Sequence, residues 1–256
     1  MERLHKIAAV VEKAGEIVRS AREIAAQTTQ KTSAADLVTA YDIKVEAFLK
    51  QALLPLVPGA AFYGEEEAEN ADPTTGWVFV VDPIDGTANF VRGFCQSAIS
   101  VALAKDGRVE YAVVLDPFKN ELYTAKRGCG AFLNGQPIHV SGKPLAEGIF
   151  GMGTAPYDKA LHEKTLAITR QLFDQSCDFR RMGAAALDLC AVACGRLELF
   201  FECVLSPWDY AAGWLLVEEA GGSVCTLEGQ PLRLDGRCSV WACNAVCQEI
   251  RAGLPL

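Results

Sequence analysis

Histidine is scarce in this sequence, and its cysteines lack the spacing of a zinc site. There are three histidines in 256 residues, and none of the ten cysteines belongs to a Cys-x-x-Cys pair. Structural zinc sites combine closely spaced cysteine and histidine ligands. We therefore interpret the cysteines as free thiols, buried or half-buried, in a protein of a reducing compartment.

Positive charge and long apolar runs are also lacking. Lys and Arg number 24 against 32 Asp and Glu, which leaves a net charge of −8. This balance argues against a nucleic-acid partner or an anionic membrane surface, because both are bound through surplus Lys and Arg. No segment has the roughly 18 continuous apolar residues of a membrane span, and the N-terminal residues show helical periodicity rather than an apolar leader. We expect a cytoplasmic protein with no membrane partner.

Apolar periodicity in the first half predicts two helices and then a sheet. Apolar residues recur at helical spacing over 2–28 and again near 38–54. Short β-like runs follow, with Asp106-Gly107 and Asn134-Gly135 as hairpin turns. The predicted strands cover 77–81, 97–104, 109–115 and 121–125. We expect an antiparallel sheet across residues 77–140.

The pattern changes after Pro144, where helices and strands begin to alternate. Helices are predicted at 158–174, 184–194, 207–220 and 245–252, and strands at 149–150, 197–203, 223–227 and 239–242. Such alternation is typical of an α/β layer. The expected fold class is therefore α/β, with an α+β half that contains the antiparallel sheet at 1–143 and an α/β half at 144–256.

One predicted strand leads into a segment with two aspartates. The apolar run 77–81 is followed directly by Asp82-Pro83-Ile84-Asp85-Gly86-Thr87-Ala88-Asn89-Phe90. Pro83 fixes its own φ, and Gly86 permits positive φ or close backbone approach. We expect both carboxylates to point into one pocket, where a helix that begins near Gly86 presents free N–H groups to an anion. A simple turn is the alternative interpretation, since Asp, Pro and Gly all favour turns.

Further acids lie at the ends of other predicted elements. Asp42 and Asp209 are at the starts of predicted helices, and Glu65 and Glu66 follow a short apolar run. Taken singly, they could be helix caps or solvated charges. Together with the segment at Asp82 they form an oxygen-only ligand set, which suits Mg²⁺, Mn²⁺ or Ca²⁺. Two such cations can activate a water and stabilise the leaving oxygen in phosphoryl transfer. They would also attract an anionic substrate to an acidic protein.

Four sequence motifs, in this order along the chain, resemble those of the inositol monophosphatase family. They are Ala35-Asp36-Leu37-Val38-Thr39-Ala40-Tyr41-Asp42, Gly64-Glu65-Glu66, the segment Asp82 to Phe90, and Trp208-Asp209-Tyr210-Ala211-Ala212-Gly213 with Glu219-Ala220-Gly221-Gly222 after it. Ala88 departs from the family pattern, in which a second Thr is common. Such a departure affects the expected substrate rather than the expected reaction class.

The resemblance implies a role for each matching residue. Glu65, Asp82 and the carbonyl of Ile84 would hold one metal ion, and Asp82, Asp85 and Asp209 a second. Glu65 would also support a third ion. Thr87, hydrogen-bonded to Asp42, would activate the attacking water together with Glu65. The implied substrate contacts come from Gly86, Thr87, Gly183, Ala184, Ala185, Glu202 and Asp209, with Lys31 and Glu66 as further candidates near the metal site.

The resemblance also implies a layered α-β-α-β-α sandwich and a Mg²⁺-dependent, lithium-sensitive phosphomonoesterase. Two or three Mg²⁺ ions would be bound, with Mn²⁺ as a substitute, and the protein would be a homodimer. The expected substrate is a small sugar or cyclitol phosphate, inositol 1-phosphate first. Fructose 1,6-bisphosphate, 3′-phosphoadenosine 5′-phosphate and histidinol phosphate are alternatives from similar enzymes. A regulatory binding protein with residual phosphatase activity is an alternative of another class.

Overall fold

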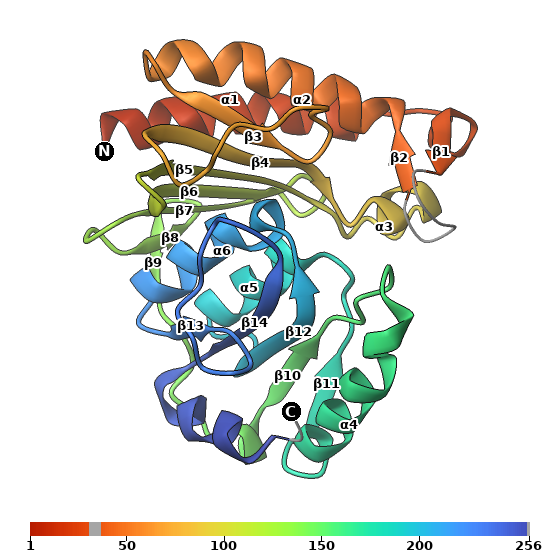
Figure 1. Cartoon of the computed structure of the whole chain (residues 1–256), viewed down its shortest axis with the longest axis vertical. Helices are drawn as coiled ribbons and strands as arrows, with labels where there is room; N and C mark the ends of the chain where they lie inside the picture. The colour runs from red at the N-terminus through yellow and green to blue at the C-terminus, as the bar shows by residue number, and fades with distance from the viewer. Residues whose placement is uncertain (31–36, 255–256) are drawn as a thin grey trace.

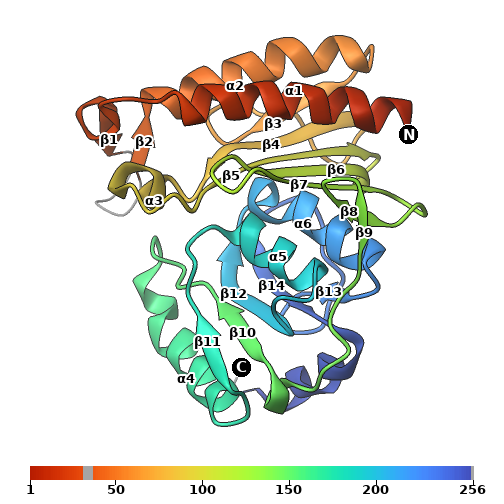
Figure 2. The ribbon, with the colours of Figure 1, turned by 180° about the vertical axis from the view of Figure 1, so that it is seen from behind.

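The computed structural model describes residues 1–30 and 37–254, and it has five layers (Figure 1). Two helices cover the outer face of one sheet, two more helices separate that sheet from a second one, and the second sheet is covered on its far side (Figure 2). The predicted α/β class and the layered sandwich are confirmed. The division at residue 143 stays a prediction.

The outer layer consists of α1 (Glu2–Arg19) and α2 (Ala40–Leu53). Their apolar faces pack on the first sheet, and the residues that gave α1 its periodicity, among them Leu4, Ile7 and Val11, are buried there. α1 ends earlier than the predicted residue 28. Glu23 adopts a left-handed backbone conformation, and Thr28–Gln30 form strand β1, which pairs with β2 (Leu37–Thr39).

The first sheet has seven strands in the order β3-β4-β5-β6-β7-β8-β9. All neighbours are antiparallel except β3 and β4. The strands are β3 (Ala61–Gly64), β4 (Trp77–Asp85), β5 (Ala98–Lys105), β6 (Arg108–Asp116), β7 (Glu121–Lys126), β8 (Ala131–Leu133) and β9 (Gln136–Ile138). Both predicted turns have two consecutive residues with positive φ, as hairpin turns require.

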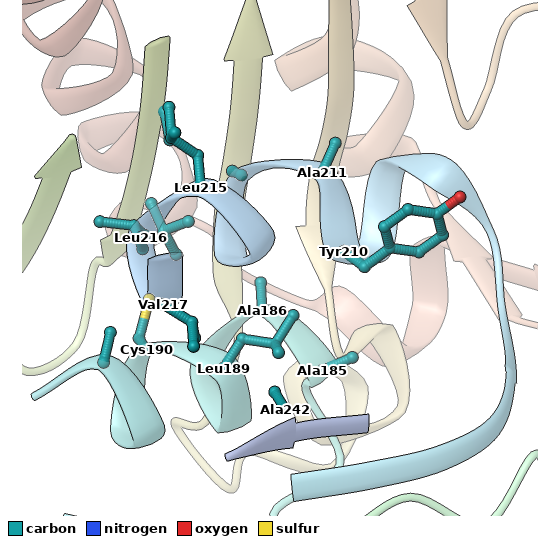
Figure 3. Close-up of a cluster of buried hydrophobic side chains, with 14 of the residues drawn as sticks. Ala185, Ala186, Leu189, Cys190, Tyr210, Ala211, Leu215, Leu216, Val217 and Ala242 are labelled. Atoms are coloured by element: carbon teal, nitrogen blue, oxygen red, sulfur yellow. The ribbon is translucent and has the colours of Figure 1, made fainter. Parts of the chain in front are cut away.

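The central layer consists of α5 (Ala185–Ala193) and α6 (Pro207–Glu219). Their small and apolar side chains pack against each other and against both sheets, as Figure 3 shows for Leu189 of α5 and Leu216 of α6. Because these helices are apolar on nearly all sides, they are buried as a layer rather than exposed on a surface.

The second sheet has the order β11-β10-β12-β14-β13. Its strands are β10 (Ile149–Met152), β11 (Asp178–Arg180), β12 (Leu199–Leu205), β13 (Ser223–Cys225) and β14 (Cys238–Cys243). Helix α4 (His162–Phe173) and the 3₁₀ helix η5 (Ala245–Gly253) pack on its outer side. The helix expected at 245–252 is present, and it is a 3₁₀ helix. Strand β11 was not predicted. No helix of the described ranges could cross a membrane.

Candidate active site

Three aspartates from two elements converge at one end of the first sheet. Asp82 and Asp85 belong to the end of β4, and Asp209 lies in the first turn of α6. Each of the three offers a carboxylate oxygen within 4.8 Å of the other two. They line a cavity of about 350 Å³ together with Glu65 and Thr87. Carboxylate oxygens this close can share divalent cations.

A β-bulge puts both aspartates of β4 on this cavity. Asp82 lies opposite Ser100 of β5 and Asp85 lies opposite Ala98, so β4 has one extra residue in this interval. In a regular strand, residues three apart point to opposite faces. The bulge removes that alternation, and the N–H of Ile84 donates to Oδ1 of Asp82 at 2.9 Å inside it.

Gly86 follows the bulge and makes the turn into the short helix α3 (Thr87–Arg92). Its φ is +85°, and a Cβ there would lie 3.0 Å from the carbonyl oxygen of Gly183 and 3.1 Å from that of Gln96. Positive φ and this crowding both require glycine. The side-chain amide of Asn89 donates to the carbonyl oxygens of Gln96 and Met182, each at 2.8 Å, which ties α3 to the loop before α5.

Asp42 and Thr87 meet beside the aspartates. The hydroxyl of Thr87 lies 3.2 Å from Oδ1 of Asp42 and 3.0 Å from the carbonyl oxygen of Ile84, and it can donate to either. Oδ2 of Asp42 accepts the N–H of Thr39 at 2.8 Å in a capping box at the start of α2. Asp42 therefore caps a helix with one oxygen and contacts Thr87 with the other.

Asp209 has the same place in α6 that Asp42 has in α2. It is the third residue of the helix, and its Oδ2 accepts the N–H of Ser206 at 2.7 Å. In both helices the aspartate reaches back to the N-cap residue, and this fixes the side chain before any ligand binds. The capping that the sequence suggested is thus present in both cases, but each aspartate caps as the third residue of its helix, and the N-cap residues are Thr39 and Ser206.

The wall opposite β4 is formed by the loop before α5 and by β12. The N–H of Ala186 donates to Oδ2 of Asp85 at 2.6 Å, so the first turn of α5 contacts the carboxylate cluster directly. Gly183, Ala184 and Ala185 line a second cavity of about 270 Å³ that continues the first. Glu202 borders both cavities and accepts the N–H of Ala155 at 2.8 Å.

The electrostatics of the carboxylate cluster by itself favour protonated carboxyls. Burial raises the pKa of Asp82 well above its usual range, and the charges of Glu65 and Asp85 raise it further. Burial likewise raises the pKa of Asp85 to about 6. The pKa of Asp209 is raised well above its usual range by burial and by the charges of Asp85 and Glu65. Bound cations would relieve this repulsion.

Burial also raises the pKa of two acids at the edges of the cluster. The pKa of Asp42 rises to about 6, with a further contribution from the charge of Glu66. The pKa of Glu202 rises to about 7. Glu66 therefore lies close enough to affect Asp42, and its N–H donates to the buried carboxylate of Glu46 at 3.0 Å. The candidate Lys31 lies outside the described residues.

Residues that the sequence did not single out also border the cavities. Arg237 and Tyr157 lie on the first, and Arg92, Arg181 and Asp188 on the second. From the net charge we expected metal ions to attract an anionic substrate, and three arginines also border the two cavities. Their signal in the sequence is weak, because arginines are common on any surface. Asp188 lay inside a predicted apolar helix.

The geometry defines a layered α/β protein with a carboxylate-lined pocket where two sheets and their helices meet. A family model described as the inositol monophosphatase family matches residues 1–252. The chain therefore belongs to the inositol monophosphatase family.

Individual relatives agree with this assignment. An inositol-1-monophosphatase of Rhizobium meliloti is 43% identical over 198 residues, which cover 76% of this chain and 74% of the relative. The Nus factor SuhB of Pseudomonas aeruginosa is 41% identical over 222 residues, or 84% and 82% of the two chains. The crystal structure of the extragenic suppressor protein SuhB from Bartonella henselae is similar with a TM-score of 0.89 at 33% identity, covering 98% of this chain and 96% of that one.

Proposed function

We propose that this protein is a Mg²⁺-dependent phosphomonoesterase that hydrolyses a small cyclitol or sugar phosphate, with inositol 1-phosphate as the first candidate. The observation that carries the proposal is the convergence of Asp82, Asp85 and Asp209 within 4.8 Å beside Glu65. The family supports the reaction class, and the relative named inositol-1-monophosphatase supports the substrate.

The residues present fit hard divalent cations. Every side chain in the cluster is a carboxylate, and none of the described residues that line the cavity is a His or a Cys. Oxygen-only sites suit Mg²⁺ and Mn²⁺. In this proposal Glu65, Asp82 and the Ile84 carbonyl hold one ion, and Asp82, Asp85 and Asp209 a second, with Glu65 available to a third. Bound Mg²⁺ would lower the pKa of a water molecule and neutralise the leaving oxygen.

The chain's own groups position the reactants. Asp42 fixes the Thr87 hydroxyl, which orients the attacking water and takes a share of its proton. The backbone of Gly86 and Thr87 contacts the phosphate, since the tight turn brings main-chain N–H groups to the cavity. Glu202 and the segment Gly183–Ala185 contact the alcohol part of the substrate. Catalysis by such a site consists mostly of positioning and electrostatic stabilisation.

The test is phosphate release by the protein after chelation and after Mg²⁺ is restored. The panel contains inositol 1-phosphate, fructose 1,6-bisphosphate, 3′-phosphoadenosine 5′-phosphate and histidinol phosphate. We expect no turnover after chelation, recovery with Mg²⁺, and the highest kcat/KM for inositol 1-phosphate. No release from any ester would contradict the proposal. A higher kcat/KM for a bisphosphate would move the assignment to that substrate.

A relative named Nus factor SuhB favours a second candidate function, a regulatory binding protein that keeps the hydrolase site. A catalytically inactive variant distinguishes the two functions. If Asp85→Asn has no turnover but complements cells from which the gene for this protein has been deleted, then binding is the function that the cells require. If only the wild-type chain restores it, hydrolysis is required.

A further inference from the structure

One arginine at the first cavity has no part in the proposed chemistry. Arg237 lies in the loop that joins β13 to β14, and it is exposed at the border of the cavity that contains the carboxylate cluster. Among the described residues, its guanidinium has no hydrogen-bond or ion-pair partner. The acids of the cluster are therefore not its partners, and the cation is available to a ligand. A guanidinium binds phosphate oxygens through two parallel N–H donors.

The place of Arg237 in the site indicates which part of the substrate it meets. Arg237 borders the first cavity together with Glu65, Asp82 and Ile84, which hold a metal ion in the proposed function. The second cavity contains the segment Gly183–Ala185, which contacts the alcohol in that proposal, and Arg237 is not among the described residues that line it. The phosphate of the substrate belongs with the metal ions, so it lies on the same side of the site as Arg237.

A buried tyrosine that follows Asp209 in the chain holds the loop that carries Arg237. The hydroxyl of Tyr210 in α6 donates to the carbonyl oxygen of Arg233 and lies 3.2 Å from the carbonyl oxygen of Gly236. Tyr210 is fully buried, and Figure 3 shows its ring pointing away from the labelled side chains of α5. A buried hydroxyl needs such hydrogen-bond partners. The tyrosine is therefore tied to the backbone immediately before Arg237.

Apolar side chains fix the earlier part of the same loop. Leu232 and Leu234 are buried in the cluster around α5 and α6, while Arg233 and Asp235 are exposed and pair with each other at 2.7 Å. Because successive side chains of an extended segment point to opposite sides, one side of the loop packs on the central layer and the other side faces solvent. The tyrosine then holds the backbone between these leucines and β14, and so determines where Arg237 begins.

We propose that Arg237 is a substrate-binding residue whose guanidinium contacts the phosphate of the ester, and that Tyr210 is a positioning residue that presents it through the loop 228–237. This inference rests on the proposed phosphomonoesterase function and adds a cation of the chain itself to the proposed metal ions. The contact exists with the bound ester and with released phosphate alike. It therefore contributes to binding more than to the chemical step, so its loss should raise KM and leave kcat within about threefold.

The experiment measures KM for inositol 1-phosphate by phosphate release and the Kd for inorganic phosphate by titration calorimetry, both in saturating Mg²⁺. Arg237→Gln should raise KM and Kd about tenfold each, the effect of one charged hydrogen-bond donor on a phosphate. Arg233→Gln is the matched control. It changes an exposed arginine of the same loop that is not among the lining residues of either cavity, and it should change neither constant. A rise in KM without a rise in Kd would mean that Arg237 contacts the alcohol, and would overturn the proposal.

Tyr210→Phe tests the positioning role, because it removes only the hydroxyl from a buried ring. We expect KM and the Kd for phosphate to rise about threefold, with an unchanged dependence of activity on Mg²⁺. In the Arg237→Gln background the same substitution should have no further effect, since no guanidinium is left to be positioned. Equal effects in both backgrounds would show a structural role that does not act through Arg237. A Tyr210→Phe variant that does not fold in thermal unfolding would likewise overturn the positioning role.

The two measurements keep this inference separate from the proposed function. A wild-type protein that binds phosphate with Mg²⁺ but hydrolyses no ester would overturn the proposed function, while the Kd values of the variants would still test the contact of Arg237 with phosphate. An active wild-type protein with an unchanged phosphate Kd in Arg237→Gln would overturn this inference alone.

Discussion

Thr87 and Asp42 are 45 residues apart in the chain, and the Thr87 hydroxyl lies 3.2 Å from Oδ1 of Asp42. The contact joins the first turn of α3 to the first turn of α2. Asp42 is held from its other side by the capping box with Thr39, so its position does not depend on Thr87. The pair is therefore arranged as a fixed carboxylate that orients a hydroxyl, which is the arrangement a water-activating group needs.

The first prediction tests this pair. Thr87→Val keeps the side-chain shape and removes the hydroxyl, so kcat for inositol 1-phosphate should fall about 100-fold or more, the usual contribution of a positioned proton-transfer group. Thr87→Ser restores the hydroxyl and should retain most of the activity. Steady-state kinetics with saturating Mg²⁺ measure both. Equal kcat values for the Val variant and the wild-type protein would remove Thr87 from the mechanism.

The second prediction concerns Asp85. Asp85→Asn should abolish turnover, because the proposed second metal loses a ligand, yet the variant should fold. The charge of Asp85 lies beside those of Asp82 and Asp209 and destabilises the protein in the absence of metal, so removing it should leave the melting temperature unchanged or higher. Circular dichroism melts in EDTA and phosphate-release assays with Mg²⁺ measure the two effects. Near wild-type activity in this variant would contradict the metal assignment.

The third prediction is the pH dependence of stability without metal. Asp42, Asp85 and Glu202 have folded-state pKa values of about 6, 6 and 7, above those of unfolded carboxyls. Raised pKa values favour the folded protein at low pH, and this stabilisation is lost as pH rises through 6 and 7. The metal-free protein should therefore unfold at a lower temperature at pH 7.5 than at pH 5.5.

Addition of Mg²⁺ should reverse this loss. Cations bind deprotonated carboxylates, so the increase in melting temperature on adding Mg²⁺ should be larger at pH 7.5 than at pH 5.5. Asp85→Asn serves as the control, with a smaller pH effect in EDTA and a smaller response to Mg²⁺. If the wild-type protein responded to Mg²⁺ equally at both values of pH, the cluster would not be the binding site.

Local patterns in the sequence predicted most elements and the acidic candidates, but not the features that depend on distant contacts. The strand 77–81 and both hairpin turns follow from apolar alternation and turn residues. The β-bulge that turns Asp85 toward Asp82 depends on pairing with β5, which no local pattern reports. For a similar reason, the sequence pattern placed the end of the first helix at residue 28, whereas α1 ends at Arg19. Residues 20–28 contain helix-favouring alanines, while the left-handed Glu23 ends that regularity.

Asp188 shows the same limit at the active site. Within the apolar run 185–193 a single acid interrupts the pattern without changing the helix prediction. Its place beside Gly151, which is 37 residues earlier in the chain, and on the same cavity as Glu202 depends on the folded arrangement. Motif resemblance identified the acids of the carboxylate cluster, since each stands beside a turn or a helix start. It said nothing about the acid in the middle of the helix.

The last prediction separates two properties of Gly86. Gly86 and Gly93 flank α3 with φ values of +85° and +72°, but only a Cβ at Gly86 would meet neighbouring atoms. Both Gly86→Ala and Gly93→Ala should lose about 1–2 kcal/mol from the left-handed conformation, or roughly 2–8 °C in melting temperature for a chain of this size. Gly86→Ala should lose more, because its Cβ presses on the carbonyl oxygens of Gly183 and Gln96 and displaces Thr87.

Activity should distinguish the two variants more sharply than stability does. We expect Gly86→Ala to lose at least about 100-fold in kcat/KM, since small displacements of positioning groups reduce rates by such factors. Gly93→Ala should stay within a few-fold of the wild-type protein, because its Cβ faces open space outside both cavities. Melting temperatures and kinetics on the same preparations give the comparison. Similar activity losses in both variants would mean that backbone strain in α3, rather than the crowded turn at Gly86, governs the position of Thr87.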